Sequence, residues 1–369
     1  MAPNSDAGET PKTAFDELCR SLKQQYKAIE NARQSADVQL ASIRALLAKE
    51  NINLGDTLAL VVFGSLARRE STSRSDVDWT LLVDGPVDPE HIKVATRIGE
   101  ILVAAEHAEP GNTGTFGTLA SSHDIVHHIG GSDDTNRNMT RRLLLLLESR
   151  AVVGELVRSR VIRAVLGRYI FWGRGLPTNS APRLRVPRFL LNDVVRYWRT
   201  IAVDYAAKKW EQSEKKWALR NAKLRVSRKM TFVKGLLLCF DCELFPNDSL
   251  WNSAGTPKSW DDAEQLLASG CETLVEETPI DVLSRALVRL QLDELAKDLF
   301  QAYGEFLALI DDAKSRQALE TLTFDNAESD PVFGIVRNDI GRRFGDSLEK
   351  LFFTGDNELS RLTKKYGLF

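Results

Sequence analysis

Two short apolar runs, TLALVVF at residues 57–63 and VDWTLLV at residues 77–83, constrain the fold of this chain most strongly. Each run is rich in β-branched and aliphatic residues and is bounded by polar or glycine-containing stretches, a pattern that predicts a strand buried on both faces. The other apolar residues recur mostly at spacings of three and four, which is typical of amphipathic helices. The sequence therefore predicts a small sheet within a largely helical protein.

The order of these elements predicts an α+β fold with three parts. A polar leader and an N-terminal helix, single or in two joined pieces, occupy residues 1–56. Residues 57–150 form a core with a small mixed β-sheet, whose third strand we expect within residues 115–129. Residues 151–369 form a large helical domain, and the dense leucines of residues 140–166 predict one long, deeply packed helix where these two parts meet.

Composition limits the class of protein. The chain has 369 residues, of which 43% are hydrophobic and 27% are charged, values that exclude a wholly disordered or collagen-like protein. No apolar run approaches the ~20 residues that span a bilayer, and the start of the chain lacks the pattern of a secretion signal, so we expect a cytoplasmic protein without membrane contact. The CxxC of Cys239 and Cys242 lies in apolar surroundings and predicts buried, reduced thiols rather than a zinc site.

The net charge of −2 conceals two oppositely charged segments. Residues 181–235 contain 15 Lys/Arg against 4 Asp/Glu, a net charge of +11, whereas residues 258–369 contain 13 against 22, a net charge of −9. The basic segment fits either solvated helix faces, which the acidic segment can neutralise, or a surface for a triphosphate and for a polyanion such as RNA. Within it, Arg196 and Arg199 lie on a polar stripe that predicts a lined cleft, so both are candidate nucleotide-binding residues.

The residues with chemical potential lie at the ends of the two apolar runs. The first run ends in Gly64-Ser65, and Asp76-Val77-Asp78 opens the second after ten intervening residues. A Gly-Ser bend at the start of a helix lets the backbone approach a phosphate, which the serine hydroxyl and the helix amides can bind. Asp76 and Asp78 alternate along a strand and share one face, where two adjacent carboxylates repel each other unless cations lie between them. The pair thus predicts a site for two Mg²⁺ ions, with Mn²⁺ as an alternative.

A purely structural interpretation of the same residues is a solvated strand start after a polar loop, with Gly64 as an ordinary turn residue. The position of Asp78 inside an apolar run argues against it, because an unpaired carboxylate is costly to bury there. The metal-site interpretation requires both carboxylates to lie on the side of the sheet that the Gly-Ser bend faces.

The stretch LVVFGSLARRESTSRSDVDWTLLVD resembles the nucleotidyltransferase superfamily typified by DNA polymerase β, kanamycin nucleotidyltransferase, the CCA-adding enzymes and the PII uridylyltransferases. That superfamily has a hydrophobic strand, Gly-Ser or Gly-Gly, a short helix with basic residues, and Asp-x-Asp in the next strand. The resemblance covers about residues 57–150 and implies that they form a nucleotidyltransferase catalytic core. The matching residues are Gly64, Ser65, Arg68, Arg69, Ser75, Asp76 and Asp78.

The resemblance also implies roles for these residues. Arg68, Arg69 and Ser75 join Gly64 and Ser65 as candidate nucleotide-binding residues. Asp76 and Asp78 are the first two members of a catalytic and metal-binding set of three.

The superfamily places the third acid on a later strand. Asp124, in SSHDIVHHIGG, is the simplest candidate, because the expected third strand contains no other acid. Asp133 and Asp134, in the stretch that follows, are the reserve candidates. The candidate catalytic and metal-binding residues are therefore Asp76, Asp78 and Asp124.

The activity implied by the resemblance is transfer of a nucleoside monophosphate from an NTP to a hydroxyl acceptor on a protein or an RNA, with release of pyrophosphate. Two alternatives remain open. One is a synthase that joins nucleotides to each other to make a second messenger. The other is a non-catalytic module with the same fold that binds nucleotide or nucleic acid.

Overall fold

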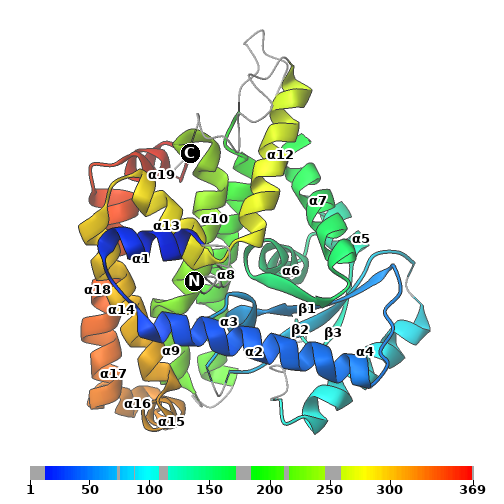
Figure 1. The fold of residues 1–369 in the computed structure, drawn as a ribbon, viewed down its shortest axis with the longest axis horizontal. Coiled ribbons are helices and arrows are strands. Elements are labelled where there is room, and N and C mark those ends of the chain that lie inside the picture. Colours follow the sequence, from blue (N-terminus) through cyan, green and yellow to red (C-terminus); the bar gives the residue numbers. More distant parts are fainter. Residues whose placement is uncertain are drawn as a thin grey trace, which may run out of the picture.

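The computed structural model describes residues 13–72, 75–86, 88–107, 115–171, 184–211, 216–245 and 259–367. They form an α+β structure that is mostly helical and contains a small mixed sheet of four strands (Figure 1). The α+β class predicted from the sequence is therefore confirmed. Most of the predicted polar leader lies outside the described residues.

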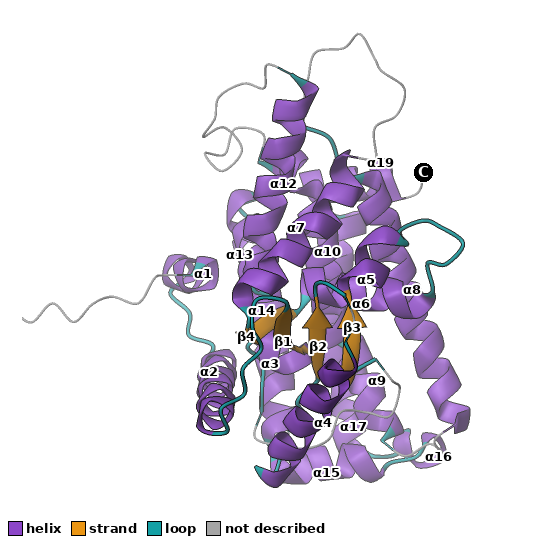
Figure 2. Ribbon diagram, turned by 90° about the vertical axis from the view of Figure 1, so that its right-hand side faces the viewer, coloured by secondary structure: helices purple, strands orange, loops and turns teal. Residues whose placement is uncertain are grey.

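The sheet contains both strands predicted from the apolar runs. These are β1 (Leu58–Phe63) and β2 (Trp79–Val83), which pair antiparallel with Leu58 opposite Val83. β3 (Thr118–Ser121) pairs parallel with β2, and β4 (Ser149–Val153) pairs antiparallel with β1, so the strand order is β3-β2-β1-β4 (Figure 2).

Alternation along β1 divides the core into two layers around the sheet. Leu60 and Val62 pack against α2 (Lys27–Lys49) and α4 (Pro89–Ala104), which cover one face. Val61 and Phe63 point to the other face and pack into the core shared with α6 (Asn136–Leu147) and the helical bundle. Thr80 and Leu82 of β2 share that second face by the same alternation, and so does Asp78 just before the strand.

The remaining helices extend the chain on either side of the sheet. α1 (Ala14–Leu22) and α2 are separate because Lys23, with φ of 53°, ends α1 in the left-handed conformation, so the N-terminal helix has the two joined pieces. The other helices before the bundle are α3 (Gly64–Ala67), α5 (Ser122–His127) and α7 (Glu155–Phe171).

The bundle occupies the rest of the described chain, and two of its segments are short π-helices, labelled η. It consists of α8 (Arg188–Glu211), α9 (Trp217–Arg225), α10 (Ser227–Leu244), α12 (Trp260–Glu276), α13 (Pro279–Arg289), α14 (Asp293–Asp311), α15 (Ala313–Thr321), α16 (Phe324–Ala327), α17 (Pro331–Ile335), η1 (Val336–Ile340), α18 (Gly341–Glu349), η2 (Lys350–Thr354) and α19 (Glu358–Gly367).

The prediction of one long helix over residues 140–166 is wrong. The leucines end α6 at Leu147, and the chain then forms β4 before α7 begins at Glu155. Gly154 follows the last residue of β4, has a φ of +84° and lies so close to β1 that a Cβ there would be 2.4 Å from the carbonyl oxygen of Leu58. The β-branched pair Val152-Val153 before a glycine is the local signal for the strand, and the leucines mask it.

We expect Gly154→Ala to lower the free energy of unfolding by about 1–3 kcal/mol, because the substitution combines a left-handed backbone with a backbone clash. Gly55→Ala is the matched control: Gly55 also has a positive φ, of 56°, but a Cβ there meets no atom within 4 Å. Urea unfolding of both variants measures the difference. Equal losses for the two would show that β4 does not lie as close to β1 as described.

Three cysteines of the bundle are buried and free: Cys239 and Cys242 of α10 and Cys271 of α12. Burial raises the pKa of each thiol, which keeps it protonated. The prediction of buried, reduced thiols for Cys239 and Cys242 is confirmed.

Lys234 of α10 is also buried, and its Nζ donates hydrogen bonds to the backbone oxygens of Val275 (2.9 Å) and Glu277 (2.7 Å). Burial lowers the pKa of this amine from 10.5 to about 7. Between these two values the unfolded chain binds the proton and the folded chain does not, so this group makes the protein more stable as the pH rises from about 7 towards 10.5.

We therefore expect the free energy of unfolding of the wild type, relative to Lys234→Met, to increase between pH 7 and pH 9. Urea unfolding of both proteins at the two pH values measures this difference. The contributions of titrating groups that both proteins share cancel in the comparison. A difference that stays constant or shrinks with pH would contradict the lowered pKa of Lys234.

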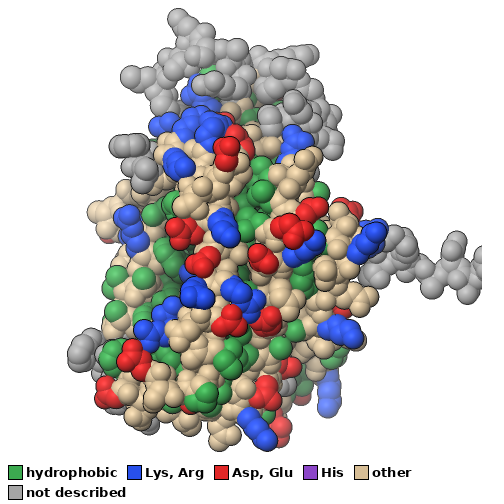
Figure 3. Space-filling model, turned by 90° about the vertical axis from the view of Figure 1, so that its left-hand side faces the viewer, with side chains coloured by type: hydrophobic (Ala, Val, Ile, Leu, Met, Phe, Trp, Pro, Cys, Tyr) green, Lys and Arg blue, Asp and Glu red, His purple; other side chains and the backbone are tan. Residues whose placement is uncertain are grey.

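Within the described ranges, no helix combines the length and the apolar character needed to cross a membrane. On the side of the molecule formed by α14, α17 and α18, Lys/Arg and Asp/Glu side chains intermingle (Figure 3). The acidic excess of the C-terminal segment is therefore interspersed with cations on this face.

Candidate active site

The Gly-Ser bend lies directly beside the second aspartate. Gly64 has a φ of +65° where β1 passes into α3, and a Cβ there would be 3.1 Å from Oδ2 of Asp78. The backbone N–H of Phe63 donates to the carbonyl oxygen of Asp78 at 2.8 Å, which fixes the two strand ends against each other. The bend and this carboxylate therefore occupy the same side of the sheet, as the metal-site interpretation requires of Asp78.

Asp76 and Asp78 are electrostatically coupled. Asp78 is half-buried, and burial raises its pKa to about 6, with a further increase from the negative charge of Asp76 and a decrease from Lys223. Asp76 is exposed. A carboxylate whose pKa is raised by a neighbouring carboxylate forms, together with that neighbour, a donor set suited to a divalent cation, which removes their repulsion.

The loop before the two aspartates is held by its own side chains. The Oγ of Ser75 accepts from the N–H of Thr72 and contacts its Oγ1, both at 3.0 Å. Thr72 in turn accepts a hydrogen bond from Arg316 of α15 at 3.3 Å. Ser75, predicted to bind nucleotide, thus has a structural partner within the loop, and the loop is tied to the helical bundle.

Two other predicted nucleotide-binding residues have carboxylate partners. Arg68 is buried, with 8% of its surface exposed, and forms ion pairs with Glu70 (2.8 Å) and Glu148. Arg69 forms an ion pair with Asp37 of α2, with Nε donating at 3.0 Å. Each guanidinium therefore has a carboxylate partner in the structure, and nucleotide binding by Arg68 and Arg69 stays a prediction.

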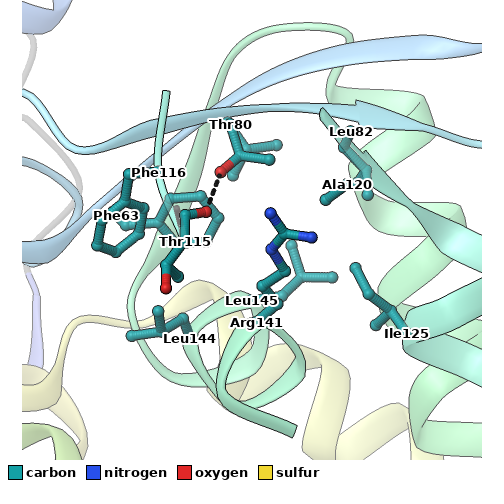
Figure 4. Close-up of a pocket in the computed structure, with 11 residues that line it drawn as sticks. Phe63, Thr80, Leu82, Thr115, Phe116, Ala120, Ile125, Arg141, Leu144 and Leu145 are labelled. Carbon is teal, nitrogen blue, oxygen red and sulfur yellow. Dashed lines mark hydrogen bonds between the residues drawn. The ribbon is translucent and has the colours of Figure 1, made fainter. Parts of the chain in front are cut away.

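Asp124 does not lie on a strand as expected. It lies in the first turn of α5, because Ser121 caps this helix by accepting from the N–H of His123. On β3, the residue opposite Thr80, and thus on the face of Asp78, is Thr118. Its hydroxyl accepts from Arg141 at 2.9 Å, and Figure 4 shows the guanidinium of Arg141 pointing into the space beneath the strands.

In the part of the chain that the structure describes, no three His, Cys, Asp or Glu side chains come together as a metal site. Asp124 is therefore not joined to Asp76 and Asp78 in such a group. Of the reserve candidates, Asp133 is exposed and Asp134 is bound to the buried guanidinium of Arg142 at 2.9 Å.

Arg196 and Arg199 line an open pocket on α8, as their polar stripe predicts. The pocket has a volume of about 420 Å³ and also contains Asn136, Asn192 and Thr200. Arg196 donates to Oδ1 of Asn136 at 3.0 Å. This places Arg196 at the start of α6, whereas the aspartates lie where β2 begins.

The bundle brings further side chains to the aspartates. Lys223 of α9 belongs to the basic segment for which the sequence analysis offers a triphosphate surface as one interpretation, and the charges of Asp76 and Asp78 act on it. Burial, together with the charges of Arg316 and Arg228, lowers the pKa of Lys223 to about 8, while the two aspartates oppose this decrease. The excess of basic residues in this segment was the only signal for it.

Sequence reasoning gave no indication of Glu148. It immediately precedes β4, and its charge contributes to the raised pKa of Asp78. Its carboxylate is buried and is bound by Arg68 and by the hydroxyl of Thr231 at 2.7 Å. Glu148 therefore links the sheet to the bundle behind the site.

No model of a known protein family matches this chain, and a comparison with curated proteins finds no match either.

Proposed function

We propose that this protein is a metal-dependent nucleotidyltransferase, which moves a nucleoside monophosphate from an NTP to a hydroxyl acceptor and releases pyrophosphate. The observation that carries the proposal is the contact between the Gly64 bend and Asp78, because the bend is the backbone that we expect to bind phosphate and Asp78 is a carboxylate that we expect to bind the metal. The coupling of Asp78 to Asp76 and the nearby charge of Lys223 support it.

Asp76 and Asp78 are the residues that would hold Mg²⁺. Bound there, the ion would polarise the α-phosphate and favour the deprotonated form of the attacking hydroxyl. Mg²⁺ commonly takes only one or two protein carboxylates and completes its coordination with water and substrate phosphates, so the pair suffices as a protein donor set.

The chain's own residues supply positioning and charge. The left-handed Gly64 leaves room beside Asp78 for a phosphate oxygen, and the N–H groups at the start of α3 and the Ser65 hydroxyl donate hydrogen bonds to it. Lys223 faces the aspartates from the bundle and stabilises the negative charge that develops on the leaving pyrophosphate.

A second candidate function is a non-catalytic nucleotide-binding module with the same architecture. The observation that favours it is the threonine at position 118, on the strand and face where the superfamily's third acid is expected. A module of this kind binds nucleotide but transfers nothing.

The test is incubation of the protein with each of the four α-³²P-labelled NTPs and Mg²⁺, with and without total RNA and cell extract. Transfer predicts label on a macromolecule or in a small product, and no label after addition of EDTA. Nucleotide binding without any labelled product in all reactions would overturn the enzyme and favour the non-catalytic module.

A further inference from the structure

The helices α9 and α10 carry a group of cations that no carboxylate of the described residues pairs with. We call this group the basic track; it comprises Lys223, Arg225, Arg228 and Lys229. All four side chains are half-buried, so their positions are defined by packing rather than by free rotation in solvent. Elsewhere on the molecule many arginines have a carboxylate partner, for example Arg343 with Asp339 and Arg361 with Glu358.

Cations lie close to one another along this track, although Asp346 also acts on Lys229, and Asp76 and Asp78 act on Lys223. Burial is the main cause that lowers the pKa of Lys223, Arg225 and Lys229, and the strongest charged neighbour of each is another cation. These neighbours are Arg316 for Lys223, Arg337 for Arg225, and Arg225 for Lys229. Like charges held together at this density favour a polyanionic ligand that neutralises several of them at once.

Glycines of α18 make room for the far end of the track. A Cβ at Gly341 would be 3.5 Å from the Cβ and Cδ atoms of Arg225, and a Cβ at Gly345 would be 3.4 Å from Nζ of Lys229. Both glycines belong to α18, whereas Arg225 ends α9 and Lys229 lies in the first turn of α10, so α18 contacts the chain on both sides of the junction between these helices.

Aromatic rings lie at the start of α9. Trp217 contacts Phe324 edge-on at 5.2 Å between ring centroids, and Tyr205 at 6.3 Å. Phe324 is 47% exposed, and Trp217 and Tyr205 are half-buried. Asn221 joins this cluster to the cations, because it donates to the Tyr205 hydroxyl at 2.8 Å and accepts from Arg225 at 2.6 Å.

Along α9, the aromatic rings lie at the first residue of the helix and the cation nearest the active site, Lys223, lies near its end. Trp217 opens the helix, and Lys223 stands six residues further on, about 9 Å along the helix axis. That rise corresponds to roughly two to three stacked nucleotides at about 3.4 Å each. α9 packs against α15, and the charges of Asp76 and Asp78 act on Lys223 near the end of α9.

We propose that the acceptor is the 3′ end of a single-stranded polynucleotide, which lies along α9 with its phosphates on the basic track and a base against the rings of Trp217 and Phe324. This inference rests on the proposed function. Aromatic rings interleaved with cations favour a polynucleotide over an acidic protein segment, because a peptide carboxylate gains nothing from stacking.

The transfer step needs no reactant other than the NTP and the acceptor. The oxygen of the terminal 3′-hydroxyl forms a bond to the α-phosphorus, while the bond from that phosphorus to the oxygen bridging to the β-phosphate breaks. Pyrophosphate leaves with the bonding electron pair. The hydroxyl proton passes to water.

The first test is fluorescence anisotropy with 5′-labelled single-stranded RNA and DNA 12-mers of mixed sequence, read at several salt concentrations. We expect Arg225→Gln with Lys229→Gln to weaken binding about tenfold or more and to reduce the slope of log K against log salt by about 1.4, since each phosphate contact contributes about 0.7. Lys93→Gln with Arg97→Gln on α4 is the control of equal charge, on exposed cations, and should bind as the wild type does.

Trp217 also packs in the core, so its role is tested without substitution. A 4-thiouridine RNA 12-mer, cross-linked by light to the wild-type protein, should label peptides that contain α9. Cross-links confined to other segments, or equal losses of affinity in the α9–α10 and α4 double variants, would overturn the inference. The affinities for the RNA and DNA 12-mers are then compared. Tighter binding of one identifies it as the acceptor, and equal affinity means that the protein accepts both.

Failure of this inference differs from failure of the proposed function. Asp76→Asn with Asp78→Asn should keep the affinity of the wild type for the RNA 12-mer and lose its labelling by α-³²P-NTP. Label that appears on a protein or in a small product, and not on the 12-mer, overturns the polynucleotide acceptor and leaves the transferase intact. No label on any acceptor overturns the transferase itself.

Discussion

Asp78→Asn is expected to lower the rate of nucleotidyl transfer by about 10³-fold while the protein stays folded. The amide keeps the shape of the side chain but removes a negative charge that would hold Mg²⁺, an ion that contributes several kcal/mol to transition-state stabilisation. Because burial and Asp76 already oppose ionisation of Asp78, the substitution should leave thermal stability without Mg²⁺ unchanged or slightly increased. Initial rates with saturating NTP, and a melting curve in EDTA, measure both effects.

Asp124→Asn is the matched control for this prediction. The structure places Asp124 in the first turn of α5, outside any three-residue metal group of the described chain, so its rate should stay within about threefold of the wild type. A loss as large as that of Asp78→Asn would show that Asp124 completes the catalytic set after all, as the resemblance first implied.

Arg68→Met is expected to lower the free energy of unfolding by about 3–5 kcal/mol, because it leaves Glu70 and Glu148 buried without their counter-charge. Arg69→Met, one residue away, removes a partly exposed pair with Asp37 and should cost about 0–1 kcal/mol. Urea unfolding of the two variants makes the comparison.

The two arginine variants also separate a structural role from phosphate binding. If Arg68 contacted the nucleotide, its loss would raise the KM for NTP and leave stability almost unchanged. The described ion pairs predict the opposite, a large loss of stability in Arg68→Met together with little change in KM for Arg69→Met.

Local pattern was sufficient to predict the centre of this fold. The apolar runs that became β1 and β2 are short and continuous. β2 begins at Trp79, so Asp76 and Asp78 lie just before the strand, and the position of Asp78 is given by its contact with the Gly64 bend. The proximity of Gly64 to Asp78 follows from antiparallel pairing of the two strands, which brings the end of the first to the start of the second.

β4 and the arginine pairs could not be predicted in the same way. The leucines of α6 continue a helical pattern up to the strand, and the signal for the strand is only five residues long. Arg68 finds Glu148 across 80 positions of sequence, and a basic residue carries no local sign of such a partner. The helix predicted to carry phosphate-binding arginines therefore uses one of them to join the sheet to the bundle.

The cations opposite the aspartates depend on tertiary packing as well. Lys223 and Arg316 come from a basic and an acidic segment respectively, so net charge along the sequence located the first and gave no indication of the second. Packing of α9 against α15 unites them beside the aspartates. Residues that reach a site from a different part of the fold cannot generally be predicted from local sequence patterns, because their position depends on contacts between segments far apart in the sequence.

The central claim is that Asp76 and Asp78 bind a divalent cation together with a nucleotide bound at the Gly64 bend. Its most direct test is a titration of Mn²⁺, followed by electron paramagnetic resonance, into wild type and into Asp76→Asn with Asp78→Asn, each with a non-hydrolysable NTP analogue. We expect the wild type to bind Mn²⁺ with an affinity that the nucleotide increases, and the double variant to lose that binding. Equal Mn²⁺ binding by the two proteins would contradict the claim.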